Sequence, residues 1–277
     1  MANRHFGELV RAQWDKGHFL CVGLDPELSK IAESVRMENV GDTIIAFNRA
    51  IVDATKDIVV AYKPNAAFYE SEGVEGWRAL KETVAYIHAV APQVPVILDA
   101  KRGDIGNTNK GYARMAFDLV GADAVTVQPY VGGESLEPFL GRSDKGVFVV
   151  VKTSNEGSGE FQNLECNGES LYKTVARHVA EKWNKNGNCG VVVGTTYPEE
   201  MRDVRAIVGT IPILMPGTGA QGGDLEASVQ AGKNKNGSGM IINVSRAVLY
   251  ASDQSDFASA ARTRAQEFAG VISKALV

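Results

Sequence analysis

The chain of 277 residues has few cysteines and no excess of positive charge. Its three cysteines, Cys21, Cys166 and Cys189, are widely spaced and never form a CxxC pair, so neither a disulfide framework nor a zinc site is indicated. The 29 basic residues stand against 33 acidic ones, giving a net charge of −4, and no basic tract is present. This charge balance disfavours a surface that neutralises nucleic-acid phosphates, so we expect a small-molecule ligand.

Long apolar runs are also missing. No segment approaches the ~20 apolar residues that a membrane helix needs, and residues 1–17 carry charges inside their apolar stretch without a leader-type cleavage site. We therefore expect an unprocessed protein of the reducing cytoplasm with no membrane partner. The four histidines occur outside any triad context, so no pair of nucleophile and histidine is indicated.

Short strand-like runs dominate the rest of the sequence. Hydrophobic residues make up 44% of the chain and charged residues 22%, which is typical of globular proteins. Eight runs rich in valine, isoleucine and leucine read as continuous apolar stretches, the pattern of parallel strands covered on both faces. We place these strands at residues 18–24, 58–63, 94–99, 122–127, 146–152, 188–193, 211–215 and 240–244.

Helical periodicity separates these strands. The main helices are predicted at residues 43–56, 76–90, 109–120, 170–185 and 198–208, with a helix at 6–15 below the sheet and another at 256–276. Eight alternating units match the size of a (β/α)8 barrel better than that of a doubly wound sheet with a second domain. We therefore predict an α/β fold, a (β/α)8 TIM barrel, with residues 1–277 as a single domain. The irregular stretch 153–168 has the length of a lid.

Charged residues gather at the predicted strand ends, which is where (β/α)8 barrels place their active sites. Asp99 and Lys101 are two apart at the end of the third strand, so both face the barrel mouth, and Asp104 follows in the loop. Asp25 and Lys63 end the first and second strands. A structural ion-pair network is the alternative interpretation, but so many charges at neighbouring strand ends favour a functional site.

A phosphate site is predicted after the seventh and eighth strands. Gly217 and Gln221 belong to a glycine-rich loop before a helix, and Arg246 adds a planar charged group suited to phosphate oxygens. Residues 217–222 also match GxGxxG, the dinucleotide fingerprint. That fingerprint expects an acidic residue about 20 positions further on, and residues 227–252 contain none. We therefore expect phosphate binding and reject NAD as a cofactor.

The residues at these strand ends resemble the orotidine 5'-phosphate decarboxylase family. The strongest match is LDAKRGDIGNT at residues 98–108, which resembles the signature of that family. The likeness extends to GLDP at 23–26, KPN at 63–65, KTSN at 152–155, PG at 216–217 with Gln221, and SR at 245–246. The KTSN run and the long loop after it resemble a bacterial branch with extended loops, although Glu156 stands where proline is expected.

The resemblance implies a cofactor-independent carboxy-lyase without a metal, which makes uridine 5'-phosphate in de novo pyrimidine biosynthesis. It implies a homodimer in which Asp104 and Thr108 reach the partner's site. The implied catalytic residues are Lys63, Asp99, Lys101 and Asp104. The implied substrate contacts are Asp25 and Thr108 to ribose, Ser154 to the pyrimidine, and Gln221 and Arg246 to phosphate.

The charges also suggest a mechanism. Loss of carbon dioxide leaves an electron pair on C6 of the pyrimidine, and an ammonium at Lys101, fixed between Asp99 and Asp104, can stabilise that carbanion and protonate it. Two alternatives stay open. One is a magnesium-dependent sugar-phosphate enzyme of the same barrel group, such as 3-keto-gulonate 6-phosphate decarboxylase or hexulose-phosphate synthase. The other is a non-catalytic nucleotide-binding protein. The Ser154 loop counts against the first and the costly charge cluster against the second.

Overall fold

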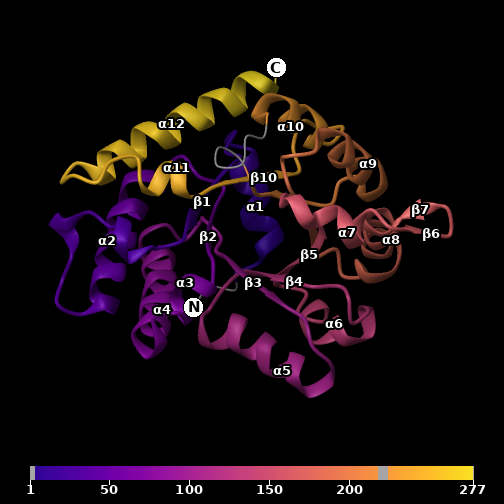
Figure 1. The fold of residues 1–277 in the computed structure, drawn as a ribbon, viewed down its shortest axis with the longest axis horizontal. Coiled ribbons are helices and arrows are strands. Elements are labelled where there is room, and N and C mark those ends of the chain that lie inside the picture. Colours follow the sequence, from indigo (N-terminus) through magenta and orange to yellow (C-terminus); the bar gives the residue numbers. More distant parts are fainter. Residues whose placement is uncertain (1–3, 218–223, 277) are drawn as a thin grey trace.

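The structure, a computed structural model, describes residues 4–217 and 224–276 and is built around eight parallel strands (Figure 1). Their order in the sheet is β2-β1-β10-β9-β8-β5-β4-β3, so neighbours in sequence are mostly neighbours in space. All eight predicted strands are present. They are β1 Leu20–Leu24, β2 Ala61–Pro64, β3 Ile97–Arg102, β4 Ala124–Val127, β5 Gly146–Lys152, β8 Cys189–Val193, β9 Ile213–Met215 and β10 Met240–Val244.

The barrel closes where β2 meets β3, and we call this contact the seam. Two isolated bridges span it, one between Tyr62 and Val96 and one between Asn65 and Asp99. The amide of Ala66 also donates to the carbonyl oxygen of Asp99 at 3.1 Å. The pairing at the seam therefore consists of isolated bridges and not of a continuous ladder. The prediction of a (β/α)8 barrel is confirmed.

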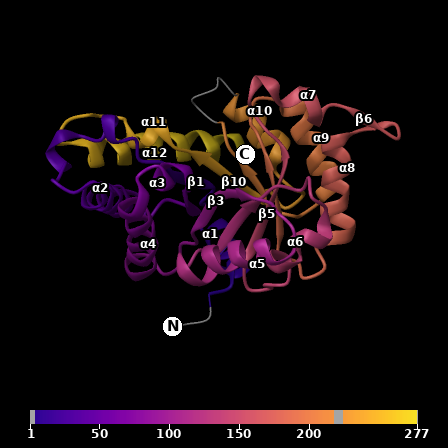
Figure 2. The ribbon, with the colours of Figure 1, turned by 60° about the horizontal axis from the view of Figure 1, so that its bottom comes forward.

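Most helices surround the sheet on its outside, whereas α1 Phe6–Trp14 lies below the barrel (Figure 2). The others are α2 Val40–Thr55, α3 Ala67–Glu70, α4 Gly73–Val90, α5 Gly106–Arg114, α6 Gly133–Leu140, α7 Gly159–Gln162, α8 Leu171–His178, α9 Pro198–Val208, α10 Leu225–Gly232, α11 Arg246–Leu249 and α12 Phe257–Leu276. No helix in the described ranges has the length and apolarity of a membrane span.

Some local features differ from the expectation. The predicted helices at 109–120 and 170–185 each end in a π-helical turn, Met115–Leu119 and Val179–Trp183. The stretch expected to be irregular contains the short helix α7 and strand β6 Glu165–Cys166, which forms a hairpin with β7 Glu169–Ser170 just beyond the stretch. Strands of two residues and a one-turn helix are too short to leave a periodic signal in the sequence.

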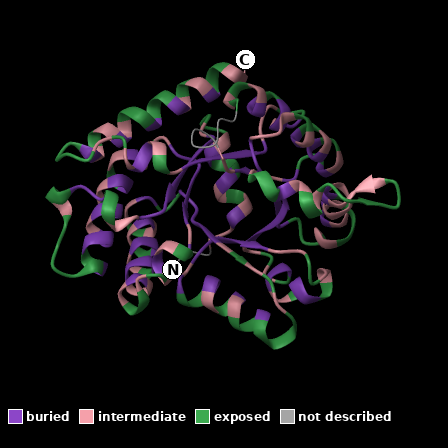
Figure 3. Ribbon diagram, viewed as in Figure 1, coloured by how far each residue is buried: buried purple, intermediate pink, exposed green. Residues whose placement is uncertain are grey.

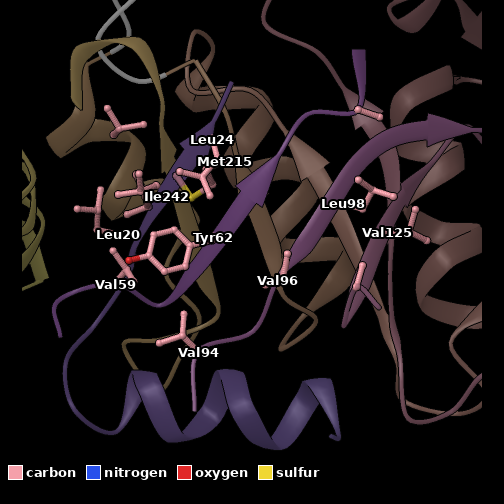
Figure 4. Packing of buried hydrophobic residues seen from close by; sticks show 14 of the residues in the cluster. Leu20, Leu24, Val59, Tyr62, Val94, Val96, Leu98, Val125, Met215 and Ile242 are labelled. Carbon is pink, nitrogen blue, oxygen red and sulfur yellow. The ribbon is translucent and has the colours of Figure 1, made fainter. Parts of the chain in front are cut away.

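Two apolar layers explain why the strands read as continuous hydrophobic runs. Alternate side chains of a strand point to opposite faces, so Leu20, Val22 and Leu24 pack outward against the helices while Cys21 faces the barrel interior. The barrel strands are buried except at the end of β3, from Ala100 to Arg102 (Figure 3), and Figure 4 shows part of the outer layer. Below the barrel, Phe6 of α1 meets the ring of Phe148 edge-on, at 5.6 Å between centroids, as the predicted bottom helix should.

Ahead of α1, the amino-terminal segment is tied to the barrel by a buried carboxylate. Arg4 donates to both oxygens of Asp123, from Nε and Nη2, at 2.8 Å each. Asp123 also accepts from the amide of Val96 at 2.9 Å and lies 3.2 Å from Nε2 of His88. Burial would raise the pKa of Asp123, but Arg4 and His88 outweigh it and lower the pKa to about 2.

Candidate functional site

Three of the predicted catalytic residues form a continuous chain of ion pairs at the barrel mouth. Asp99, near the end of β3, accepts from both lysines: Lys63 Nζ lies 3.0 Å from its Oδ2, and Lys101 Nζ lies 2.7 Å from its Oδ1. Asp25, just after β1, adds a second carboxylate with its Oδ1 4.0 Å from Lys63 Nζ. These residues come from three adjacent strands, as the strand-end argument predicted.

The charged state of this cluster follows from its geometry. Burial would lower the pKa of Lys63, but Asp25 and Asp99 outweigh it and raise the pKa above its ordinary value. Burial would likewise raise the pKa of Asp99, yet Lys63 and Lys101 hold it well below the usual range. Both groups are therefore ionised at neutral pH. The two lysines differ in access, because the side chain of Lys63 is 3% exposed and that of Lys101 is 42% exposed.

Beneath the ions lies a thiol that stays neutral. Cys21 is fully buried inside the barrel, and burial raises its pKa to about 12. Its Sγ is 3.7 Å from Oδ1 of Asn243. Cys21 therefore belongs to the apolar residues that fill the barrel interior.

Asp25 has an acceptor atom that the described residues leave free. Its Oδ1 is buried and no hydrogen-bond donor reaches it, since Lys63 Nζ stops at 4.0 Å. The backbone carbonyl of Asp25 accepts from the hydroxyl of Tyr250 at 2.8 Å, which fixes the turn. A buried acceptor without a donor is costly, and a ligand hydroxyl placed here would satisfy it.

Asp104 is not part of the chain of ion pairs within one subunit. Among the described residues no ion pair joins it to Lys101, and its Oδ1 instead accepts from the amide of Ile105 at 2.7 Å. Its own amide donates to Asn109. Thr108 lies exposed on α5 just beyond it. A single chain therefore does not place Lys101 between Asp99 and Asp104, the position expected from the sequence.

Ser154 lies where the loop after β5 crosses the barrel mouth. Its side chain is so close to Gly194 that a Cβ at that position would lie 2.6 Å from the Cβ of Ser154. Gly217, with φ at +102°, approaches it from the other side. The carbonyl of Ser154 accepts from the hydroxyl of Thr196 at 3.3 Å. Glycine at 194 and 217 thus gives this serine its position.

Lys152 anchors the same loop from below, a role that the sequence reasoning missed. Its Nζ donates to Asn163 Oδ1 at 2.7 Å and to Ser158 Oγ at 3.3 Å, and it lies 5.1 Å from the ring centre of Tyr197. The residue is 1% exposed, and burial lowers its pKa. The only indication of this role in the sequence was that Lys152 is the first residue of the KTSN run.

The predicted phosphate residues are described in part. Arg246 is exposed at the first position of α11, directly after β10. A Cβ on Gly23 would collide with the side chain of Ser245, so glycine is required for β1 to approach this turn. Gln221 lies outside the described residues.

Metal binding needs a cluster of ligands. In the described part of the chain, no three histidine, cysteine or acidic side chains lie together in such a cluster. Asp25 and Asp99 face lysines instead. Independence from metal and cofactor stays a prediction, which an assay in chelator tests.

Comparisons with known proteins agree with this geometry. The family model described as "Orotidine 5'-phosphate decarboxylase / HUMPS family" matches residues 18–261. The chain is 51% identical over 262 residues to orotidine 5'-phosphate decarboxylase of Ralstonia nicotianae, covering 94% of this chain and 95% of the relative. It is 50% identical over 270 residues to that of Cupriavidus metallidurans, covering 97% and 98%. The solved structure of Leishmania donovani OMP decarboxylase is similar, with a TM-score of 0.83, 40% identity and coverage of 97% and 98%.

Proposed function

This chain belongs to the orotidine 5'-phosphate decarboxylase / HUMPS family, and we propose that it converts orotidine 5'-phosphate into uridine 5'-phosphate by electrostatic stabilisation alone. One observation carries the mechanism: a buried carboxylate, Asp99, lies between two ammonium groups at the barrel mouth. The decarboxylase activity itself is the reaction named for relatives that share half of this sequence over nearly the whole chain.

The reaction needs a fixed positive charge beside C6 of the pyrimidine. The bond from C6 to the carboxyl carbon breaks, carbon dioxide leaves, and the electron pair stays on C6. The ammonium of Lys101 stabilises that pair and donates the proton that makes the new C–H bond, and the lysine later regains a proton from water. Asp99 holds the Lys101 ammonium in position by a hydrogen bond until then, and Lys63 in turn holds Asp99.

The remaining predicted residues hold the substrate. Asp25 accepts from ribose hydroxyls, which is supported by its buried oxygen without a donor. Ser154 contacts the pyrimidine from the loop after β5, and Gln221 and Arg246 bind the phosphate. Binding energy from this unreacting phosphate orients the ring over Lys101.

We assign the active form as a cytoplasmic homodimer in which Asp104 and Thr108 complete the partner's site. In support, Asp104 is not paired with Lys101 in its own chain. Ile105, the next residue, is 63% exposed, and Tyr130, in the loop after β4, is 94% exposed; apolar surface of this kind is suited to an interface. The cytoplasm is favoured because the cysteines are free thiols.

The surroundings of the carboxylates disfavour the magnesium-dependent alternative. Such an enzyme needs carboxylates free to bind a hard cation, whereas Asp99 is already bonded to two lysines. A non-catalytic nucleotide-binding protein needs no such cluster, because burying these ions is costly without a use for them.

A spectrophotometric assay of the purified protein tests the proposal. We expect orotidine 5'-phosphate absorbance to fall at the same rate with and without chelator, and Lys101→Ala to lower turnover by about 1,000-fold or more while uridine 5'-phosphate still binds. Activity lost in chelator would favour the magnesium alternative. Nucleotide binding without any turnover would favour the binding protein, and full turnover in Lys101→Ala would exclude the lysine as the acid.

A further inference from the structure

The third strand changes its course at the catalytic lysine. β3 and β4 pair in register at Leu98 with Val125, but the next pair is Arg102 with Val127. Three residues of β3 therefore face a single residue of β4, and Lys101 has φ at +45°, in the left-handed region. Lysine rarely adopts this conformation because its Cβ crowds the backbone. Something other than the strand ladder must hold it.

The residue facing this bulge is Thr126. It is fully buried in β4, and its Oγ1 accepts from the backbone amide of Lys101 at 2.9 Å. The same hydroxyl donates to Asp99 Oδ1 at 2.9 Å. Asp99 Oδ1 in turn accepts from Lys101 Nζ at 2.7 Å. The bonds form a closed ring that starts and ends on one lysine.

We propose that Thr126 is a positioning residue that sets the backbone of Lys101 and the orientation of Asp99 through a single hydroxyl. This inference rests on the proposed function, because it concerns the acid of that reaction. A hydroxyl can accept from the amide and donate to the carboxylate through a single oxygen atom. Valine has the same shape and provides neither bond, while serine retains both.

The consequence for chemistry is geometric. The bulge directs the Lys101 side chain, and the hydroxyl fixes the carboxylate that its ammonium meets. If the hydroxyl is lost, the amide of Lys101 loses its partner and the left-handed turn loses its support, so the ammonium leaves the position that faces C6. A displacement of about 1 Å can lower a rate by about 100-fold. Ribose and phosphate contacts come from other strand ends and are not altered.

The test compares Thr126→Val with Thr126→Ser in the full-length protein, using orotidine 5'-phosphate as substrate. We expect Thr126→Val to lower kcat by about 10- to 100-fold while KM changes less than about 3-fold. We expect Thr126→Ser to stay within about 5-fold of the unaltered protein. A crystal structure of Thr126→Val should show Lys101 shifted out of the left-handed region.

Thr83→Val is the matched control. Thr83 is equally buried on α4 and accepts from Asn48 Nδ2 at 3.0 Å, away from the ions. Loss of the Thr83 hydroxyl should lower the stability of the fold without lowering kcat. If Thr126→Val does not fold, Thr126→Ala is compared with Thr126→Ser, because both lack the methyl group and only serine keeps the hydroxyl.

Two results would overturn the inference: unaltered kcat in the variant without the hydroxyl, or a loss in Thr126→Ser as large as that in Thr126→Val or Thr126→Ala. Failure of the proposed function is separate, because it appears in the unaltered protein as an absence of decarboxylation.

Discussion

Lys63 and Lys101 carry the same charge but have different surroundings, and the difference assigns them different tasks. Lys63 is almost fully enclosed and lies between Asp25 and Asp99, so its ammonium is held as a fixed charge. Lys101 keeps one ion pair and a side chain that solvent and substrate can reach. Only the accessible lysine is suited to give up a proton and regain it.

At the same scale, Arg246 provides a prediction about the phosphate. Arg246→Ala should lower kcat/KM for orotidine 5'-phosphate by about 100-fold or more, because a charge-assisted pair with phosphate is lost. A truncated substrate that lacks the phosphate should be turned over about equally by both proteins. Steady-state rates on the two substrates measure this. Equal losses on both would contradict the assignment.

The sequence predicted individual residues only where a motif carried them. Asp99 and Lys101 follow an apolar run, so their strand-end position could be read directly, and the chain of ions agrees with it. Thr126 sits inside a run of β-forming residues, where a threonine is unremarkable. The left-handed turn at Lys101 could not be predicted from the sequence, because the residue there is not glycine. The place of Asp104 depends on a second chain, which no pattern within one chain supplies.

Among the elements, strands were predicted more faithfully than connections. Parallel strands buried on both faces leave uninterrupted apolar runs, so β5 was predicted with its observed bounds at residues 146–152. Helix α6, residues 133–140, was not predicted because it has only eight residues and contains Pro138. The irregular pairing of β3 with β4 arises from contacts between strands, which a single strand's sequence does not encode.

The amino-terminal segment and β4 give an element-scale prediction about pH. The pKa of Asp123 is about 2 in the folded protein and about 3.9 in an unfolded chain. Its pairing therefore stabilises the fold above about pH 4, by about 2 to 3 kcal/mol, and this stabilisation is lost as the pH falls through about 2. Asp123→Asn should thus lower Tm at pH 7, and the gap to the unaltered protein should narrow to about half at pH 3.

Thermal unfolding at fixed protein concentration, followed by circular dichroism at both pH values, measures this gap. Asp118→Asn is the control, because Asp118 pairs with Arg142 on the surface, at 2.9 Å and with both side chains well exposed. Exposed pairs contribute at most about 1 kcal/mol. A gap for Asp123→Asn that stays constant from pH 7 to pH 3 would show that its carboxylate charge does not provide the stabilisation.

For the whole molecule, the fold class could be predicted and the assembly could not. Eight strands with intervening helices leave one reasonable architecture, and the observed sheet agrees. The assignment of residues 1–277 to one domain stays a prediction. The dimer was implied only by resemblance, and the proposed sharing of Asp104 between subunits needs its own experiment.

Mixing two inactive variants tests that sharing. If Lys101 of one chain works with Asp104 of the other, a dimer of one Lys101→Ala chain and one Asp104→Ala chain contains one intact site. After exchange at equal concentrations, half of the dimers are mixed, so activity should recover to about 25% of the unaltered level. If each site is built from one chain, the mixture keeps only the residual activities of the two variants.

The seam has a consequence for how this scaffold changes over evolutionary time. At the seam, where β2 and β3 pair only through isolated bridges, the hydrogen bond between Lys63 and Asp99 also links the two strands. One interaction thus serves both reactivity and architectural closure. A variant in which either ion is replaced to gain a new reaction would also need another interaction to join β2 to β3. New activities are therefore easier to obtain by changing the loops at the barrel mouth than by changing these two strands.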